Sequence, residues 1–182
     1  MTRLCCTRCL RPQSHCICAL AVPVDNELEL LILQHPLEAR QAKGTARLLH
    51  LCLAHSRLLV GEVFDPAELA PLLASAVLLY PNDPARHGPP LPAAPSRLIV
   101  LDGTWRKSRK MLALNPLLQA LPRLSWEQPP ASRYAVRKAQ RAHQLSTLEA
   151  AALALEQLEA RDQLPLWLAF QRLMDGLGPP QG

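Results

Sequence analysis

The sequence predicts an α/β protein in which a mainly parallel β-sheet carries helices on both faces. Short apolar runs of strand length alternate along the chain with segments of helical periodicity. One such run, residues 98–101, passes directly into a helical segment that begins near Thr104. Hydrophobic residues make up 49% of the 182 positions, which is enough for the core of one compact domain.

The first part of the chain contains three short apolar runs that we expect to form strands, at residues 28–33, 58–60 and 76–80. Pro36, Gly61 and Pro81 follow them, and each of these residue types interrupts regular strand pairing. Helices are expected between the strands, opening at Gly44 and at Pro66.

The remaining elements follow a proline-rich loop at residues 81–95, which cannot form regular structure. Residues 98–101 are expected to be a strand buried on both faces, because the run is short, apolar and β-branched. Residues 124–126 are the last expected strand. Ser146 begins a capping-box sequence and Pro165 favours a first helical turn, so two helices should complete the chain.

Asp102 and Gly103 lie where the strand at 98–101 gives way to its helix. In a parallel sheet this carboxyl edge is where ligands usually bind. Gly103 is expected to allow a tight turn with positive φ, and Thr104 to cap the helix. The following helix should end at Asn115 and Pro116.

Two basic segments and a net charge of +5 favour a polyanionic partner such as nucleic acid, although a solvated surface would explain the charge alone. The helix after Thr104 places four basic residues opposite its apolar side, namely Arg106, Lys107, Arg109 and Lys110. The second segment combines an aromatic ring with positive charge, in Arg133, Tyr134, Arg137, Lys138, Arg141 and His143.

Five of the six cysteines fall within the first 18 residues. Four of them form the closely spaced pairs Cys6-x2-Cys9 and Cys16-x-Cys18, a pattern that favours tetrahedral zinc. Cys5 and His15 are possible substitutes, and free or oxidised cysteines are the alternative. We therefore expect a cysteine-rich zinc knuckle at residues 1–22 and a second domain at residues 23–182.

Several classes of protein are not indicated by this sequence. It has no apolar run of about 18 residues and no apolar core of a signal peptide, so we expect a cytoplasmic protein without a membrane partner. It also lacks G-x-G-x-x-G and G-x-x-x-x-G-K-[ST]. Neither a dinucleotide-binding turn nor a P-loop is predicted.

The tetrapeptide Asp102-Gly103-Thr104-Trp105 resembles the Asp-x-Thr-Trp signature of the DTW-domain family. Further family-like blocks occur in the same order over nearly the whole chain: the cysteine pairs, His35-Pro36-Leu37-Glu38, Gly44-Thr45-Ala46-Arg47-Leu48, Leu79-Tyr80-Pro81, Arg109-Lys110-Met111, Ser132-Arg133-Tyr134-Ala135-Val136-Arg137 and Leu145-Ser146-Thr147-Leu148-Glu149-Ala150.

This resemblance implies a tRNA-uridine aminocarboxypropyltransferase. Such an enzyme moves the 3-amino-3-carboxypropyl group of S-adenosyl-L-methionine (SAM) to N3 of a uridine in tRNA and releases methylthioadenosine. The resemblance also implies a SPOUT-like fold with a C-terminal knot for residues 23–182, and we expect a monomer. A SPOUT-type RNA methyltransferase using SAM and a non-catalytic zinc-bearing RNA-binding module remain the alternatives.

Carried onto this chain, the resemblance assigns the residues of a cofactor wall. The expected cofactor wall is Leu79, Tyr80, Pro81, Leu101, Gly103, Thr104, Trp105, Ser146 and Thr147. The residues expected to hold RNA phosphates are Arg106, Arg109, Lys110, Arg133, Arg137 and Arg141. Asp102 is the candidate catalytic base, and its carboxylate could instead steady the sulfonium, orient the uracil or cap a helix. His35 and Glu38 are reserve candidates at another strand end.

Overall fold

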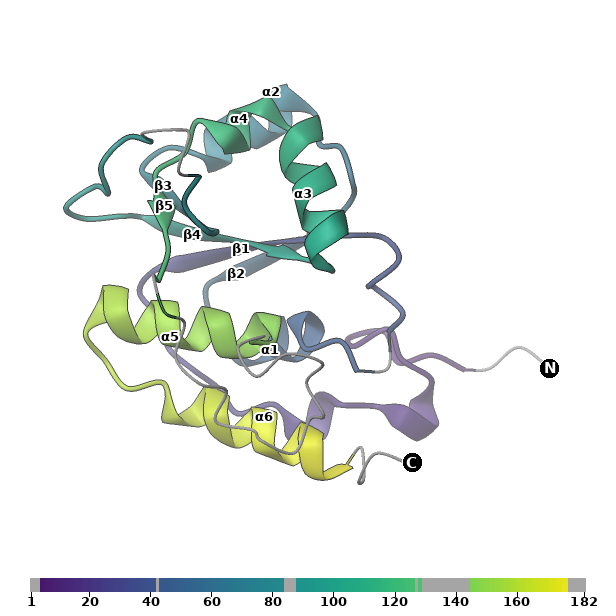
Figure 1. The fold of residues 1–182 in the computed structure, drawn as a ribbon. Coiled ribbons are helices and arrows are strands. Elements are labelled where there is room, and N and C mark those ends of the chain that lie inside the picture. Colours follow the sequence, from purple (N-terminus) through teal and green to yellow (C-terminus); the bar gives the residue numbers. More distant parts are fainter. Residues whose placement is uncertain (1–3, 42, 84–87, 127, 129–144, 177–182) are drawn as a thin grey trace.

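The computed structural model describes residues 4–41, 43–83, 88–126, 128 and 145–176 (Figure 1). Its centre is a five-stranded sheet in the order β2-β1-β4-β3-β5, and every neighbouring pair is parallel. The strands are β1 Glu29–Gln34, β2 Ser56–Val60, β3 Ala76–Leu79, β4 Arg97–Asp102 and β5 Arg123–Leu124. The predicted α/β class with a parallel sheet is confirmed.

Helices cover both faces of this sheet (Figure 1). One face carries α2 Pro66–Leu69, α3 Trp105–Leu114 and α4 Pro116–Gln119. The other face carries α1 Ala46–Cys52 and α5 Thr147–Glu159, with α6 Leu164–Gly176 packed outside them. Three short 3-10 helices complete the described elements, at Gln13–His15, Cys18–Leu20 and Ala70–Leu72.

The alternation of side chains along the two central strands divides the core into two layers. Leu31 and Leu33 pack with the α2, α3 and α4 side, whereas Leu30 and Ile32 pack with the α1, α5 and α6 side. By the same alternation, Gln34 points toward α5. Asp102 does so too, because the β1–β4 register pairs it with Gln34. The last residues of both central strands therefore lie beneath the start of α5.

The N-terminus of α5 is held firmly. Ser146 Oγ accepts the backbone N–H of Glu149 at 3.3 Å, and Glu149 Oε2 accepts the backbone N–H of Ser146 at 2.8 Å. This reciprocal pair is the predicted capping box. The Thr45 hydroxyl accepts the backbone N–H of Leu148 at 3.2 Å and so ties α5 to the start of α1. Both contacts fix the position of Thr147.

The described residues of the segment between β3 and β4 contain no helix, as expected for the proline-rich loop. Two other details differ from the expected elements. Pro116 ends α3 but also begins the short helix α4, since proline fits a first helical turn. The strand β5 stops at Leu124, short of the expected Trp126.

Among the helices of the described residues, none combines the length and the apolar character that crossing a bilayer would require.

Candidate active site and metal site

A cavity of about 280 Å³ opens where strands β3, β4 and β5 end. Leu79, Leu101 and Leu124 contribute strand ends to its wall, and Thr147 contributes the start of α5. This is the carboxyl edge of a parallel sheet, where loops supply the groups that hold ligands. The volume lies near the lower limit of about 300 Å³ for small-molecule sites.

The expected cofactor residues converge on this cavity with a single exception. Those that line it are Leu79, Tyr80, Pro81, Leu101, Gly103, Trp105, Ser146 and Thr147. Thr104 is not among the lining residues. Its hydroxyl accepts the backbone N–H of Lys107 at 3.4 Å, which is the helix-capping role predicted from the sequence.

The cavity wall also contains residues that the sequence analysis missed, namely Val100, Ser108, Leu124, Ser125, Trp126, Leu145 and Ala150. The Ser108 hydroxyl lies 3.5 Å from the Tyr80 hydroxyl. Ser125 and Trp126 follow a strand end just as Tyr80 and Pro81 do. This position after a strand end is the signal that could have identified Ser125 and Trp126, but both were expected to lie within the last strand.

Two aromatic rings stand at one side of the cavity. Tyr80 and Trp105 meet edge to face, with ring centroids 6.0 Å apart and planes inclined by 70°. The Arg123 guanidinium lies 5.6 Å from the Tyr80 ring centroid. Trp105 lines the cavity and is still 49% exposed, so its indole can contact a ligand that arrives from solvent.

Asp102 lies directly behind the cavity wall and is only 6% exposed. One carboxylate oxygen, Oδ2, accepts a hydrogen bond from Gln34 Nε2 at 2.8 Å. The other, Oδ1, accepts one from the Thr147 hydroxyl at 2.5 Å. Leu101, Gly103 and Thr147 line the cavity, whereas Asp102 does not. The carboxylate is therefore linked to the cavity wall by its hydrogen bond from the Thr147 hydroxyl.

Burial raises the pKa of the Asp102 carboxyl above its ordinary value. The hydrogen bonds from Thr147 and Gln34 oppose this shift because they stabilise the ionised form. The charge of Glu38 raises the pKa further, and that of Lys107 lowers it. The net effect is a carboxylate that is more basic than one in water.

Gly103 does not have the positive φ that was predicted for it. Glycine is favoured here for a different reason. A Cβ at this position would lie 3.2 Å from the Cβ of Lys107 and 3.6 Å from that of His35. A side chain would therefore crowd the loop after β1 against the first turn of α3.

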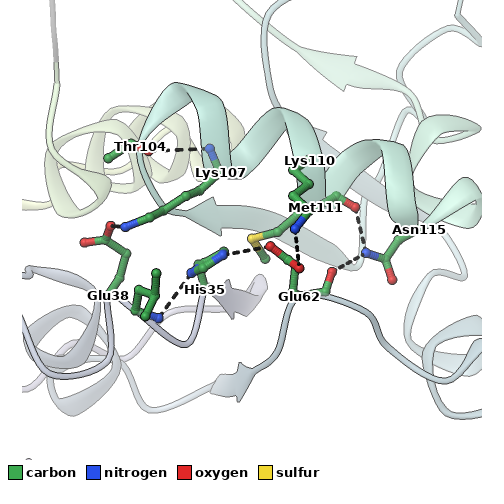
Figure 2. Close-up of polar contacts among 9 residues, drawn as sticks. His35, Glu38, Glu62, Thr104, Lys107, Lys110, Met111 and Asn115 are labelled. Carbon is green, nitrogen blue, oxygen red and sulfur yellow. Dashed lines mark hydrogen bonds and ion pairs between the residues drawn. The ribbon is translucent and has the colours of Figure 1, made fainter.

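A polar network joins α3 to the loops that follow β1 and β2 (Figure 2). His35 Nδ1 accepts the backbone N–H of Leu37 at 3.1 Å, so the ring proton is on Nε2, which donates to Glu62 at 3.0 Å. Hydrogen bonds from Lys110 and His35 lower the pKa of Glu62. His35 is thus engaged in structure and does not line the cavity.

The basic side of α3 is divided by these ion pairs (Figure 2). Lys107 Nζ lies 2.6 Å from Glu38 Oε1, and Lys110 Nζ lies 2.9 Å from Glu62 Oε2. Arg106 and Arg109 are exposed, and the Arg109 Nε donates to the Trp105 carbonyl at 3.3 Å. The other three expected phosphate ligands, Arg133, Arg137 and Arg141, lie outside the described residues.

The sulfur atoms of Cys6, Cys9, Cys16 and Cys18 lie within 4.8 Å of one another and could hold a metal ion. Cys6 and Cys18 are 3.7 Å apart, as are Cys9 and Cys16. Four thiolates bound to zinc at about 2.3 Å would be about 3.8 Å apart in a tetrahedron. Cys5 does not belong to this group.

His15 does not belong to the group either, and its Nδ1 lies 2.9 Å from the Ser14 hydroxyl.

Local backbone contacts bring these thiols together. The N–H of Cys6 donates to the Arg11 carbonyl at 2.8 Å, and the N–H of Leu10 donates to the Cys6 carbonyl at 2.9 Å. Hydrogen bonds from the backbone N–H groups of Cys9 and Arg8 lower the pKa of Cys6 to about 6, which favours the metal-binding thiolate.

Two knuckle residues, Cys9 and Ile17, are buried in the same core as Phe170 of α6. The domain boundary expected after residue 22 stays a prediction.

Comparison with known proteins identifies the family. Residues 3–176 match the DTW domain. The chain is 32% identical over 173 residues to tRNA-uridine aminocarboxypropyltransferase 2 of Macaca fascicularis, covering 87% of this chain and 58% of that protein. It is 34% identical to the proteins of the same name from Mus musculus and Drosophila melanogaster, over 167 and 175 residues.

The mouse alignment covers 85% of this chain and 56% of the relative, and the fly alignment covers 87% and 68%. The chain thus spans less than two thirds of the two mammalian relatives. No solved structure matches it. Since the DTW match extends over nearly the whole sequence and includes every segment that lines the cavity, the chain belongs to the DTW-domain family.

Proposed function

We propose that this protein transfers the 3-amino-3-carboxypropyl group of SAM to N3 of a uridine in tRNA and releases methylthioadenosine. One observation carries the proposal: residues 101, 103 and 105, in and beside the DTW signature, line one cavity together with the ends of β3 and β5 and the start of α5. The relatives named tRNA-uridine aminocarboxypropyltransferase support the assignment.

The cavity suits SAM in its chemistry. Its wall is largely apolar and aromatic, with hydroxyl groups from Tyr80, Ser108, Ser146 and Thr147. Such groups can hold an adenine, a ribose and an amino acid. SAM has no phosphate, so the missing glycine-rich loop is expected. Bound here, it would supply an electrophilic methylene next to its sulfonium.

Uridine N3 attacks well only after it loses its proton, so the reaction needs a base. We propose Asp102 for this role, because burial raises the pKa of its carboxyl and a hydrogen bond links it to the cavity wall. N3 is used in base pairing, so the target uridine must be unpaired or flipped out before it reacts. The half-exposed Trp105 offers a surface on which such a base can stack.

The remaining features extend the same proposal. A zinc ion held by Cys6, Cys9, Cys16 and Cys18 would stabilise the knuckle, and thiols kept free for a metal agree with a reducing, cytoplasmic location. We also propose a monomer with a SPOUT-like topology and a C-terminal knot. The parallel sheet and the cavity at its loop edge support this topology.

The function can be tested directly by determining which carbon of SAM is transferred to tRNA. Unmodified tRNA is incubated with the protein and with SAM labelled either in its carboxyl carbon or in its methyl group, and tRNA nucleosides are analysed by mass spectrometry. Carboxyl label in a uridine is expected. Methyl label would instead show a methyltransferase, and no label from either cofactor would leave only an RNA-binding module.

The exposed arginines of α3 should contribute to tRNA affinity. Replacing Arg106 and Arg109 together with alanine is expected to weaken binding and to reduce the slope of log affinity against log salt by about 1–2, because two phosphate contacts are lost. Filter binding at several salt concentrations measures both quantities. Arg172→Ala, on the exposed side of α6, is the matched control and should change neither.

A further inference from the structure

Thr147 is the residue through which the buried acid can act on a ligand. It is the first residue of α5 and lines the cavity, whereas Asp102 does not line it. The distance from Thr147 Oγ1 to Asp102 Oδ1 is 2.5 Å, at the short limit for a hydroxyl bonded to a carboxylate. Among the described residues that line the cavity, Thr147 is the one whose side chain hydrogen-bonds to the Asp102 carboxylate, so a proton can pass between the cavity and Asp102 through this hydroxyl.

The contact also fixes the direction of the Thr147 hydroxyl. A hydroxyl has one proton and two lone pairs, while an ionised carboxylate only accepts hydrogen bonds. The Thr147 proton is therefore directed to Asp102. Among the described residues, Thr147 Oγ1 makes no second hydrogen bond. The hydroxyl can thus offer only lone pairs to the cavity, so its partner there must be a hydrogen-bond donor.

Gln34 keeps the carboxylate in this orientation. Its Nε2 donates to Oδ2 at 2.8 Å, which leaves Oδ1 directed to Thr147. Gln34 is 2% exposed, and its register opposite Asp102 is set by the β1–β4 ladder. Capping at Ser146 and the Thr45 contact hold Thr147 on the other side. Both partners of the short hydrogen bond are therefore held by ordered elements.

We propose that Thr147 is a catalytic residue that accepts the N3 proton of the target uracil while passing its own proton to Asp102. This inference rests on the proposed function and deepens it. The N3–H bond breaks as Thr147 Oγ1 takes that proton, and the Oγ1 proton moves to Asp102 Oδ1. The freed N3 electron pair forms the bond to the SAM methylene, and the carbon–sulfur electrons remain on sulfur in methylthioadenosine. Asp102 later returns its proton to solvent.

The test replaces threonine with its isostere. Thr147→Val removes the hydroxyl at nearly constant volume and is expected to lower kcat by about 100-fold or more, the usual size of a general-base contribution. Thr147→Ser retains the hydroxyl and should keep most of the activity. SAM affinity, measured by calorimetry, should fall far less than kcat in both variants, because several other residues line the cavity, and circular dichroism verifies that they fold.

The combined variant separates a relay from two independent effects. Groups that act as a unit lose their effect only once, so Asp102→Asn together with Thr147→Val should be no slower than the slower single variant. If the losses in kcat of the two single variants multiplied in the double variant, the relay would be overturned. It would also be overturned if Thr147→Val kept full kcat, or if it weakened SAM binding by the same factor as it lowered kcat/KM, which would place the SAM ammonium on this hydroxyl.

A pH profile gives a readout that a merely structural contact would not affect. The base must be ionised, so kcat should be lost as pH falls through the raised pKa of Asp102. The other charged groups that influence Asp102 are Glu38 and Lys107, which pair with each other at 2.6 Å. Gln34→Glu adds a carboxyl group at Oδ2 and should move this acidic limb to higher pH. An unmoved limb would contradict Asp102 as the proton acceptor.

Assays of the wild-type protein and of Thr147→Val distinguish failure of the proposed function from failure of the relay. If the wild-type protein transfers no aminocarboxypropyl group, the proposed function fails. If it does so and Thr147→Val is equally fast, only the relay fails.

Discussion

Asp102→Asn is expected to abolish most aminocarboxypropyl transfer, with a loss of about 1,000-fold in kcat, while tRNA and SAM still bind. Asparagine fills nearly the same volume but cannot accept a proton at neutral pH. The fold should tolerate it. Gln34 Oε1 has no hydrogen-bond partner among the described residues, and rotation of that amide would let it accept from the new side-chain NH2.

Three measurements check this prediction: the rate of label transfer, tRNA affinity and the melting temperature. Loss of transfer with little change in affinity or melting identifies a chemical role for the carboxylate. If affinity or folding fell as far as transfer, Asp102 would instead be structural.

Loss of the metal site is expected to have the largest effect on stability. Metal analysis of the purified protein should find about one zinc per chain, as a four-thiolate site requires. Cys9→Ser should lose this zinc and about 3 kcal/mol or more of unfolding free energy, because Cys9 is both a proposed ligand and a buried part of the core around Phe170. Chelation of the wild-type protein should cause a similar loss.

Cys5→Ser is the matched control, since Cys5 is exposed and lies outside the sulfur cluster. It should retain both zinc and stability in denaturant unfolding. A wild-type protein that is free of metal and fully active would end the zinc proposal.

The fold class was predictable because it depends on local patterns. Runs such as residues 98–101 are short and apolar, and the start of α5 is marked by the side chains of Ser146 and Glu149. The order of the strands in the sheet was not predictable, since pairing between β1 and β4 joins segments about 70 residues apart. That β3 and β4 would be neighbours in the sheet was not predictable either, because a proline-rich loop does not show where the next strand pairs.

The sequence could predict that several strand ends meet at the site, but not how their side chains are placed relative to one another. Placing Leu79 and Leu101 near one another required only the rule that parallel strands end at one edge. Thr147 begins a helix, and only the resemblance to the DTW-domain family placed it with them. The position of Asp102 behind the wall depends on which side of β4 faces α5, and the ion pair of Lys110 with Glu62 depends on a loop that is distant in sequence. Such long-range contacts leave no periodic signal in the chain.

The Arg11 guanidinium, which donates to the Gly44 carbonyl at 2.9 Å, gives the cysteine-rich segment an influence beyond its own fold. The next residue, Thr45, holds the backbone of Leu148, whose neighbour Thr147 contacts the acid. A few covalent bonds and hydrogen bonds therefore connect the cysteine-rich segment to Asp102 and Thr147. Partial demetallation should yield a population of molecules whose catalytic groups are misaligned, even though no sulfur atom approaches the reactants.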